Sequence, residues 1–288
     1  MKIYILPTQK ILQPSSQSIT YPKHNKDFGV EQDFFKYLTC NTKLLTSNPL
    51  KANWHYLPVY WTRWHLNHDY GKKGKNELQA RVDNLIIEPK KTFTICQYDD
   101  GPVISLPEVS LFLASRKTSH GTDIPLLSSP HQKPLIKPRK QIIASFIGRL
   151  STHNIRNDMN KLLSKKSSIL ILDGNFGVRK YTNTMLKSYV ALSPRGYGGS
   201  SFRFFEAMQL GIAPFLIGDL DTRPFKKFIN WEEISFYSKN VDQIMTILNK
   251  YSKPQLLEMG KKASKIWSDQ LNYQKWCGLV IKQLEERL

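Results

Sequence analysis

The sequence predicts an α/β fold built from two Rossmann-like domains that face a cleft. Three observations lead to this prediction: a length of 288 residues, a composition with 40% hydrophobic and 23% charged residues, and short apolar runs that alternate with helix-like segments. The length is about twice that of a typical domain of ~150 residues, so each half can bury a core of its own. The composition is typical of a packed globular protein and argues against disorder.

The second half of the chain shows the clearer alternation. Strand-like apolar runs occur at 141–147, 168–172, 189–193 and 212–217. Helical spacing of apolar residues occurs between them, at 155–164, 182–187 and 200–210. Strands that alternate with helices form βαβ units, and their parallel sheet is covered by helices on both faces. Gly211 follows the last of these helices, where a left-handed residue is favoured.

The first half shows a weaker alternation of the same kind. Its strand-like runs lie at 3–6, 54–60, 92–97 and 109–114, and its helix-like segments lie at 32–38 and 77–86. The end of the chain is helical, at 241–251, 255–268 and 273–287. Each half therefore has enough strands and helices for one α/β domain.

Residues 128–140 have the composition of a linker, since they contain three prolines and several charges. We therefore assign 1–137 to the N-terminal domain and 138–265 to the C-terminal domain. Residues 266–288 form a terminal helix that is a candidate to pack back on the first domain.

The charge is strongly positive, with 42 Lys and Arg against 23 Asp and Glu and a net charge of +19. Such an excess suggests nucleic acid as a partner, because cations neutralise phosphates. The lysines are scattered in pairs, however, and no nucleic-acid recognition motif is present, so we do not predict a nucleic-acid partner. Attraction to an anionic ligand or to an anionic membrane surface stays open.

The sequence contains no apolar run long enough for a transmembrane segment, and the apolar start of the chain stops at Pro7. We therefore expect neither a membrane anchor nor a signal peptide. Cys40, Cys96 and Cys277 are widely separated, which argues against a disulfide framework and against a zinc site. A reducing compartment is the expectation.

The densest motif joins a strand at 189–193 to a glycine-rich turn and a helix that begins with Ser200 and Ser201. The free N–H groups and the positive dipole end of such a helix favour an anion. Arg203 can bridge two phosphate oxygens, and Glu206 lies on the same helix face, where it can accept hydrogen bonds from ribose hydroxyls. The pattern indicates a nucleotide site. The alternative is that Arg203 and Glu206 only pair with each other as i, i+3 neighbours.

The same region carries a longer ordered pattern. It contains Pro-x-Gly at 194–196, Ser-x-Arg-x-x-Glu-Ala at 201–207, Gly-x-x-Pro at 211–214, an Asp-containing loop at 219–221, Pro-Phe at 224–225 and Trp at 231. Upstream are Phe-Ile-Gly at 146–148 followed by Arg156, an apolar-Pro-aromatic run at 53–60 and Asp-Ile-Pro at 123–125. This order resembles the exostosin-like glycosyltransferases, glycosyltransferase family 47, in a short form like that of bacterial or large-virus members, with a viral xylosyltransferase as one possibility.

The resemblance implies a GT-B fold with the acceptor on the N-terminal domain and a UDP-sugar donor on the C-terminal domain. It also implies inversion at the anomeric carbon with no metal and no other cofactor. The donor site is then expected at Gly148, Arg149, Arg156, Ser193, Pro194, Arg195, Gly196, Ser200, Ser201, Arg203 and Glu206. Arg156 and Arg203 could offset the charge that grows on the leaving diphosphate. Asp219 and Asp221 resemble a metal-binding DxD motif, but we interpret them as loop structure or a sugar contact.

Inversion needs a general base, and the sequence offers two candidate groups. Asp99 and Asp100 directly follow the strand at 92–97, at a carboxyl end that should face the cleft. The family commonly has His-Asp-x-Gly at this point, whereas this chain lacks the His, and a solvated acidic turn is the alternative. The aromatic cluster at 61–71 offers His65 or Asp69 instead and could stack on sugars. A buried aromatic helix is the alternative there.

The sequence as a whole predicts an inverting, metal-independent glycosyltransferase that moves a sugar from a UDP-sugar to a hydroxyl of a glycan acceptor. UDP-xylose is the first expectation for the donor, and UDP-galactose, UDP-glucuronate and UDP-N-acetylglucosamine are alternatives. A nucleic-acid-binding protein or an inactive sugar-nucleotide-binding protein is the alternative of another class. We expect a monomer or weak dimer in the cytoplasm of a bacterial cell or of a virus-infected host cell.

Overall fold

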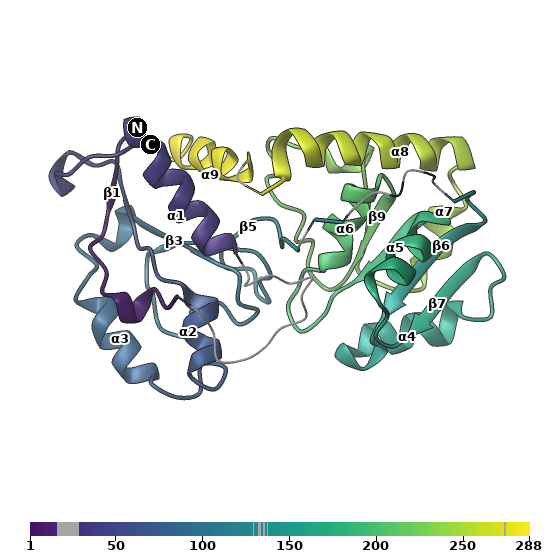
Figure 1. Cartoon of the computed structure of the whole chain (residues 1–288), viewed down its shortest axis with the longest axis horizontal. Coiled ribbons are helices and arrows are strands. Elements are labelled where there is room, and N and C mark those ends of the chain that lie inside the picture. The colour runs from purple at the N-terminus through teal and green to yellow at the C-terminus, as the bar shows by residue number, and fades with distance from the viewer. Residues whose placement is uncertain (16–28, 129, 132–133, 135, 137, 274) are drawn as a thin grey trace. The chain divides into compact units, whose positions relative to one another are not determined.

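The computed structural model describes residues 1–15, 29–128, 130–131, 134, 136, 138–273 and 275–288 (Figure 1). The chain divides into two compact units, unit 1 with Met1–Leu127 and Asn272–Leu288, and unit 2 with Ser128–Leu271. The described residues of each unit contain a five-stranded parallel sheet, which confirms the predicted α/β class with two Rossmann-like domains. The sequence-based boundaries at 137 and 265 differ slightly from these limits, and five residues of the predicted linker lie outside the described residues.

Unit 1 has its strands in the order β1-β2-β3-β4-β5, all parallel. The strands are β1 (Ile3–Ile5), β2 (Trp54–Tyr56), β3 (Thr92–Cys96), β4 (Ser110–Leu113) and β5 (Thr122–Asp123). The helices are α1 (Val30–Cys40), α2 (Trp61–Asn67), α3 (Lys75–Asp83) and α9 (Lys275–Glu285). Short 3₁₀ turns occur at Lys10–Leu12, Thr42–Leu44, Pro49–Lys51 and Pro89–Lys91.

The unit 1 sheet is covered by helices of distant sequence position. Phe34 of α1 packs on Tyr56 and Phe93, with ring centroids 5.1 and 5.8 Å away, and its ring also lies 5.8 Å from Trp276 of α9. Helix α9 therefore packs beside α1 (Figure 1). The aromatic rings of α2 pack against α3 in a second apolar cluster. This cluster also contains strand side chains that point to the other face of the sheet, such as Cys96.

Unit 2 has its strands in the order β10-β9-β8-β6-β7, again all parallel. The strands are β6 (Ile142–Gly148), β7 (Ile169–Asp173), β8 (Ser188–Pro194), β9 (Ala213–Ile217) and β10 (Phe236–Ser238). The helices are α4 (Asn154–Leu163), α5 (Val178–Leu186), α6 (Phe202–Leu210), α7 (Gln243–Leu248) and α8 (Lys253–Ile266). Short turns of 3₁₀-helix occur at Leu150–Thr152 and Trp231–Glu233, and a π-helical turn occurs at Trp267–Leu271.

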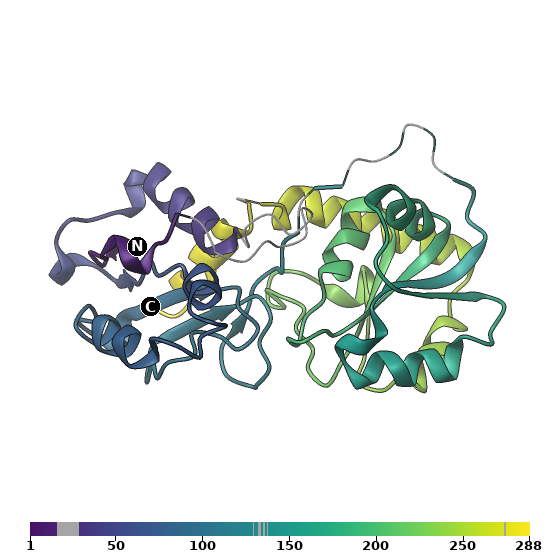
Figure 2. The same cartoon turned by 60° about the horizontal axis from the view of Figure 1, so that its bottom comes forward.

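Helices cover both faces of the unit 2 sheet (Figure 2). Along β6, Phe146 belongs to the cluster formed with α4, α7 and α8, whereas Ile147 belongs to the cluster formed with α5 and α6. This alternation follows from the two-residue period of a strand and explains why the strands read as continuous apolar runs. Pro194 and Ile217 pair at the carboxyl ends of β8 and β9.

The strand order of unit 2 reverses at β6. Strand β7 lies on one side of β6 and β8 lies on the other. The connection from β6 to β7 and the connection from β7 to β8 therefore run in opposite directions across the sheet. Ligands of open α/β sheets bind outside the carboxyl ends of the strands at such a switch point. The described strands of unit 1 follow one another in chain order, without such a reversal.

Several elements differ from their sequence-based limits. Strand β2 ends at Tyr56 because the next residues include Pro58, which has no N–H group to donate. Helix α5 starts at Val178, earlier than predicted, after Gly177 as its N-cap. Helix α2 agrees with the helix interpretation of the 61–71 cluster, one of the two that the sequence left open. Strands β5 and β10 were not predicted, because they are too short to give an apolar pattern. Within the described residues, no helix is both long and apolar enough to cross a membrane.

Candidate functional site

The predicted donor-site residues lie at the switch point of unit 2. Gly148 ends β6, Pro194 ends β8, and Arg195 and Gly196 follow directly. Helix α6 begins after Ser201, whose extended backbone caps the helix while its side chain makes no capping hydrogen bond. The structure thus brings together at this edge the segments that the motif predicts.

Two buried cations lie at this edge, the guanidinium groups of Arg156 and Arg203. Each of these residues is only 8% exposed. The Arg156 group lies 5.5 Å and the Arg203 group 4.4 Å from the ring centroid of Phe146. Both cations therefore share one aromatic ring, an arrangement in which the ring quadrupole partly compensates for lost hydration.

Backbone carbonyl groups hold Arg156 in place. Its Nε donates to the carbonyl oxygen of Arg195 (2.9 Å), Nη1 to that of Arg149 (2.9 Å) and Nη2 to that of Pro194 (3.3 Å). Burial, together with the nearby charge of Arg203, lowers the pKa of Arg156 to about 9. A negatively charged ligand would reverse this effect, so the site favours an anion.

Arg203 is fixed by a close approach that requires a glycine. Its Nη2 donates to the carbonyl oxygen of Ile147 and lies where a side chain on Gly148 would stand. Gly148 has a φ of +149°, which also disfavours any other residue. Among the residues that the structure describes, none accepts a hydrogen bond from the buried Nε of Arg203, so it is a donor that a ligand could use.

Glu206 lies one turn after Arg203 and is only 3% exposed. Its Oε2 accepts a hydrogen bond from the Tyr181 hydroxyl of α5, and its Oε1 lies 3.1 Å from His131 Nε2. The pKa of Glu206 is nevertheless lowered: burial acts to raise it, but His131, Tyr181 and the charge of Arg203 outweigh burial. The contacts of Glu206 are thus with α5 and the predicted linker, which does not favour the simple i, i+3 pair with Arg203.

The remaining predicted donor-site residues have mixed surroundings. Ser193 is buried and donates to the carbonyl oxygen of Ala191 (3.1 Å), while Ser200 is buried beside Ser201. Arg149 is exposed and contributes its carbonyl group to Arg156. Gly196 lies so close to Arg156 that an added side-chain carbon would stand 3.2 Å from Nη2.

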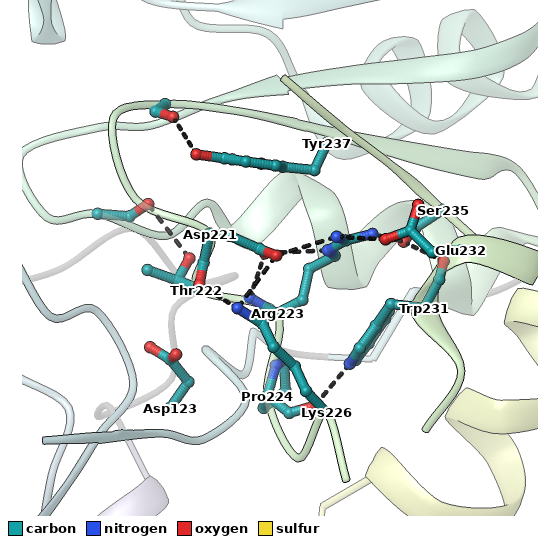
Figure 3. A network of polar contacts seen from close by, with 12 residues as sticks. Asp123, Asp221, Thr222, Arg223, Pro224, Lys226, Trp231, Glu232, Ser235 and Tyr237 are labelled. Atoms are coloured by element: carbon teal, nitrogen blue, oxygen red, sulfur yellow. Dashed lines mark hydrogen bonds and ion pairs between the residues drawn. The ribbon is translucent and has the colours of Figure 1, made fainter. Parts of the chain in front are cut away.

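The Asp-containing loop after β9 is held by arginines. Asp219 pairs with Arg195, and Asp221 receives two hydrogen bonds of 2.9 Å from Nε and Nη2 of Arg223 (Figure 3). Although burial acts to raise their pKa values, Arg195 lowers the pKa of Asp219 and Arg223 lowers that of Asp221. Both carboxylates are therefore engaged in loop structure, which is one of the two interpretations left open by the sequence.

Arg223 is the buried centre of a polar network that reaches the exposed side chain of Glu232 (Figure 3). It is 6% exposed and also donates to Glu232 Oε1 (2.7 Å) and to Ser235 Oγ (3.2 Å), and its guanidinium carbon lies 5.6 Å from the Tyr237 ring centroid. The network ties the loop after β9 to Ser235, the residue that precedes β10. Sequence reasoning did not single out Arg223, although its position in the Asp-Leu-Asp-Thr-Arg run is a local signal.

The predicted base residues lie at the carboxyl edge of the unit 1 sheet. Asp99 and Asp100 occupy the turn after β3, as expected, with Asp99 half-buried and Asp100 exposed. Asp100 Oδ1 lies 2.5 Å from Lys117 Nζ. This ion pair on the surface is consistent with a general base at the turn and also with a solvated acidic turn.

The 61–71 cluster is largely a buried helix. Trp61, Trp64 and His65 of α2 are 0–2% exposed and lie in or against the apolar cluster with α3. Burial lowers the pKa of His65 to about 4, so the imidazole is neutral at pH 7. Asp69 follows the helix with a left-handed φ of 53°. The structure thus favours the buried-helix interpretation over stacking on sugars.

Two groups at the site had no sequence signal. Tyr181 lies in α5 among polar residues, and His131 lies in the proline-rich segment before β6. Their partner Glu206 is 25 and 75 residues further along the chain, a separation that no local pattern reports.

The family model of the exostosin GT47 domain matches residues 103–251, just over half of the chain. The chain therefore belongs to the exostosin GT47 family. This match covers the whole unit 2 sheet together with the predicted donor-site residues, and it includes β4 and β5 of unit 1.

Among solved structures, the chain is similar to a variant of S. aureus TarM in complex with fondaparinux, α-GlcNAc-glycerol and UDP, with 11% identity and a TM-score of 0.38 over 72% of this chain and 58% of that chain. It is also similar to a GtfA/B complex (13% identity, TM-score 0.39, over 76% and 48%). A third is an α-glucosyltransferase in complex with UDP and a 13-mer DNA containing a HMU base (12% identity, TM-score 0.39, over 98% and 90%). The chain spans just over half the length of the TarM chain.

Proposed function

We propose that this chain is a glycosyltransferase that binds a UDP-sugar in unit 2 and transfers its sugar to a hydroxyl group of a glycan acceptor. The observation that carries the proposal is the pair of buried guanidinium groups, Arg156 and Arg203, at the switch point of a parallel sheet. Membership of the exostosin GT47 family supports the same activity.

The donor's diphosphate is the anion that these cations fit. Arg156 and Arg203 share the Phe146 ring, and the first N–H groups of α6 after Ser201 point along a helix axis whose positive end adds to their charge. The carboxylate of Glu206, one turn further, is the acceptor for the ribose hydroxyls. A phosphate site and a diol site on one helix together favour a nucleotide.

The transfer we propose is a single displacement with inversion. The oxygen of the acceptor hydroxyl forms a bond to the anomeric carbon while the bond from that carbon to the diphosphate oxygen breaks, and the electron pair leaves with UDP. Fixed cations, rather than a metal ion, would stabilise the charge on the leaving UDP. The hydroxyl proton goes to a general base, for which Asp99 and Asp100 are the first candidates and His65 and Asp69 the alternates.

Binding of UDP tests the nucleotide site directly. We expect micromolar affinity by isothermal titration calorimetry, and a loss of at least about a hundredfold in Arg203→Ala, because one buried charge contact is removed. Arg203→Lys keeps the charge but not the fork and should bind with intermediate affinity. Arg179→Ala is the matched control, since Arg179 is an exposed residue of α5 in the same unit. Equal affinity in all four proteins would contradict the proposal.

The donor sugar can be identified by thermal shift. We propose UDP-xylose first, with UDP-galactose, UDP-glucuronate and UDP-N-acetylglucosamine as alternatives, and the true donor should raise the melting temperature more than UDP alone. The charge of +19 motivates the competing function of nucleic-acid binding. Tight polyanion binding with a steep salt dependence and no response to UDP would favour that function instead.

A further inference from the structure

The carboxylate of Glu206 is buried, and burial of a charge is costly unless other groups compensate for it. Its two oxygens have different protein partners. Oε2 accepts a hydrogen bond from the Tyr181 hydroxyl, and Oε1 lies 3.1 Å from Nε2 of His131. The side chain is thus fixed from two directions by segments outside its own helix.

Both partners are themselves held in place. The Tyr181 ring centroid lies 5.9 Å from the Arg203 guanidinium carbon and 5.8 Å from the His131 ring centroid. His131 also donates its backbone N–H to Oε1 of Gln209 (3.0 Å), one turn after Glu206 on α6. Burial raises the pKa of Tyr181 well above its ordinary value, so the hydroxyl keeps its proton and remains a donor.

The carboxylate retains capacity for a ligand. An ionised carboxylate accepts hydrogen bonds only, and each oxygen has about two lone-pair positions. Among the described residues, one protein contact at each oxygen leaves one position on each for a further donor. Two neighbouring hydroxyl groups, as on the ribose of a nucleotide, match two such oxygens.

We propose that Tyr181 and His131 are positioning residues of the donor site, which orient the Glu206 carboxylate so that it selects a nucleotide with a complete ribose. The inference rests on the proposed function, because it assigns the ribose to Glu206. It adds that Tyr181 of α5 and His131 of the predicted linker decide the choice between ribose and deoxyribose. Neither residue is one of the two arginines that we propose to bind the diphosphate.

The test compares binding of UDP and of 2′-deoxy-UDP by isothermal titration calorimetry. The wild-type protein should prefer UDP by about tenfold or more, because a hydrogen bond to a charged group is lost in the deoxy compound. Tyr181→Phe keeps the ring and removes only the hydroxyl, and we expect the preference to fall to about threefold or less because the carboxylate is no longer fixed. His131→Ala should lower the preference in the same way, and His131→Asn, which retains a donor group, should restore part of it.

Tyr189→Phe is the matched control, since Tyr189 lies in β8 of the same unit with its ring 5.6 Å from Lys140 Nζ. It should keep the full preference for UDP. A merely structural role of Tyr181 and His131 would weaken both ligands equally and leave the ratio unchanged.

The outcomes separate this inference from the proposed function. If the wild-type protein binds UDP but the Tyr181 and His131 variants keep its preference, the positioning role is overturned and the proposed function stands. If the wild-type protein binds neither nucleotide, the proposed function is overturned and this inference with it. Thermal melts of each variant confirm that the ratios are measured on folded protein.

Discussion

The carboxyl edges of the two parallel sheets differ in how their charged groups are held. In unit 2, Arg156, Arg203 and Glu206 are all less than one-tenth exposed and are fixed by groups from other elements. In unit 1, Asp100 is exposed and paired with a surface lysine, whereas His65 is buried in the core.

The difference teaches that the charged groups of the two edges meet different physical conditions, as our proposal for a binding edge and a proton-accepting edge requires. Buried charges are costly, so a fold keeps them only where fixed partners or a ligand compensate. The buried charges of unit 2 have fixed protein partners and fit the nucleotide site that we propose there. An exposed carboxylate costs little and can exchange a proton with a substrate or solvent. Changes in unit 2 should therefore alter binding and stability together, and changes at the turn of unit 1 should alter turnover alone.

The largest expected effect is on turnover. If Asp99 or Asp100 is the general base, replacing that residue by Asn should lower kcat by about 10²- to 10⁴-fold, because no other group takes the acceptor proton. The affinity for UDP should not change. Asp83→Asn at the exposed end of α3 is the control. Unchanged kcat in both Asp99→Asn and Asp100→Asn would move the role to the 61–71 segment, where Asp69 is exposed and His65 is buried.

The next effect is on the stability of unit 2. Arg223→Met removes the buried cation that binds Asp221 through two hydrogen bonds but leaves Lys226 as an ion-pair partner of that carboxylate. It should lower the free energy of unfolding by about 3 kcal/mol, as expected when a largely buried pair loses one partner. Lys262→Met breaks an exposed ion pair with Glu233 and should cost less than about 1 kcal/mol. Urea denaturation measures both. Equal losses would mean that the network of Figure 3 contributes no more than a surface pair.

A third effect concerns the pH dependence of unit 1. Burial raises the pKa of Glu31 to about 7, against the counteracting hydrogen bonds from Gln97 and Thr62. Between pH 4.5 and 7 the unfolded chain loses this proton while the folded chain keeps it, so the contribution of Glu31 to stability falls as the pH rises and is level above pH 7.

Replacement of Glu31 by Gln removes this dependence. We expect the variant to gain up to about 3 kcal/mol relative to the wild type between pH 4.5 and pH 8, as measured by urea denaturation at several pH values. Glu77→Gln, at an exposed ion pair with Arg81, should show the wild-type pH profile. Parallel profiles for Glu31→Gln and the wild type would refute the raised pKa.

The smallest effect comes from a methyl group at the donor site. Gly148→Ala places a carbon against Nη2 of Arg203 at a left-handed φ, and should cost about 2 kcal/mol of stability and weaken UDP binding. Gly177→Ala is the matched control, since no atom of the described part of the chain lies within 4 Å of the added carbon. Calorimetry with UDP and thermal melts distinguish the two. Wild-type binding in Gly148→Ala would show that the close approach is not needed.

Much of unit 2 can be predicted from local sequence. The strand before Gly196, the start of α6 near Ser201 and the left-handed Gly211 each depend on neighbours along the chain, and all three appear where the pattern predicts them. Arg156 and Arg203 reach the same edge because parallel strands end at one side of a sheet.

The cluster at 61–71 shows where local sequence stops being sufficient. Its aromatic and histidine residues fit a sugar-binding surface and a core helix equally well by composition. Packing against α3 and the strands of unit 1 buries Trp61 and His65, so tertiary contacts decide between the two. The partners of Glu206 are a second example, because His131 lies 75 residues before it.

The sequence by itself determined the alternation of strands and helices, the glycine-rich turn and the order of the family motif, because these depend on residues close together in the chain. Only the tertiary structure decided the strand order with its switch point at β6, the pairing of Asp219 and Asp221 with arginines, and the contacts of Glu206 with Tyr181 and His131. The physical reason is that burial and charge compensation are set by groups brought together from distant positions, whose energies no local pattern contains.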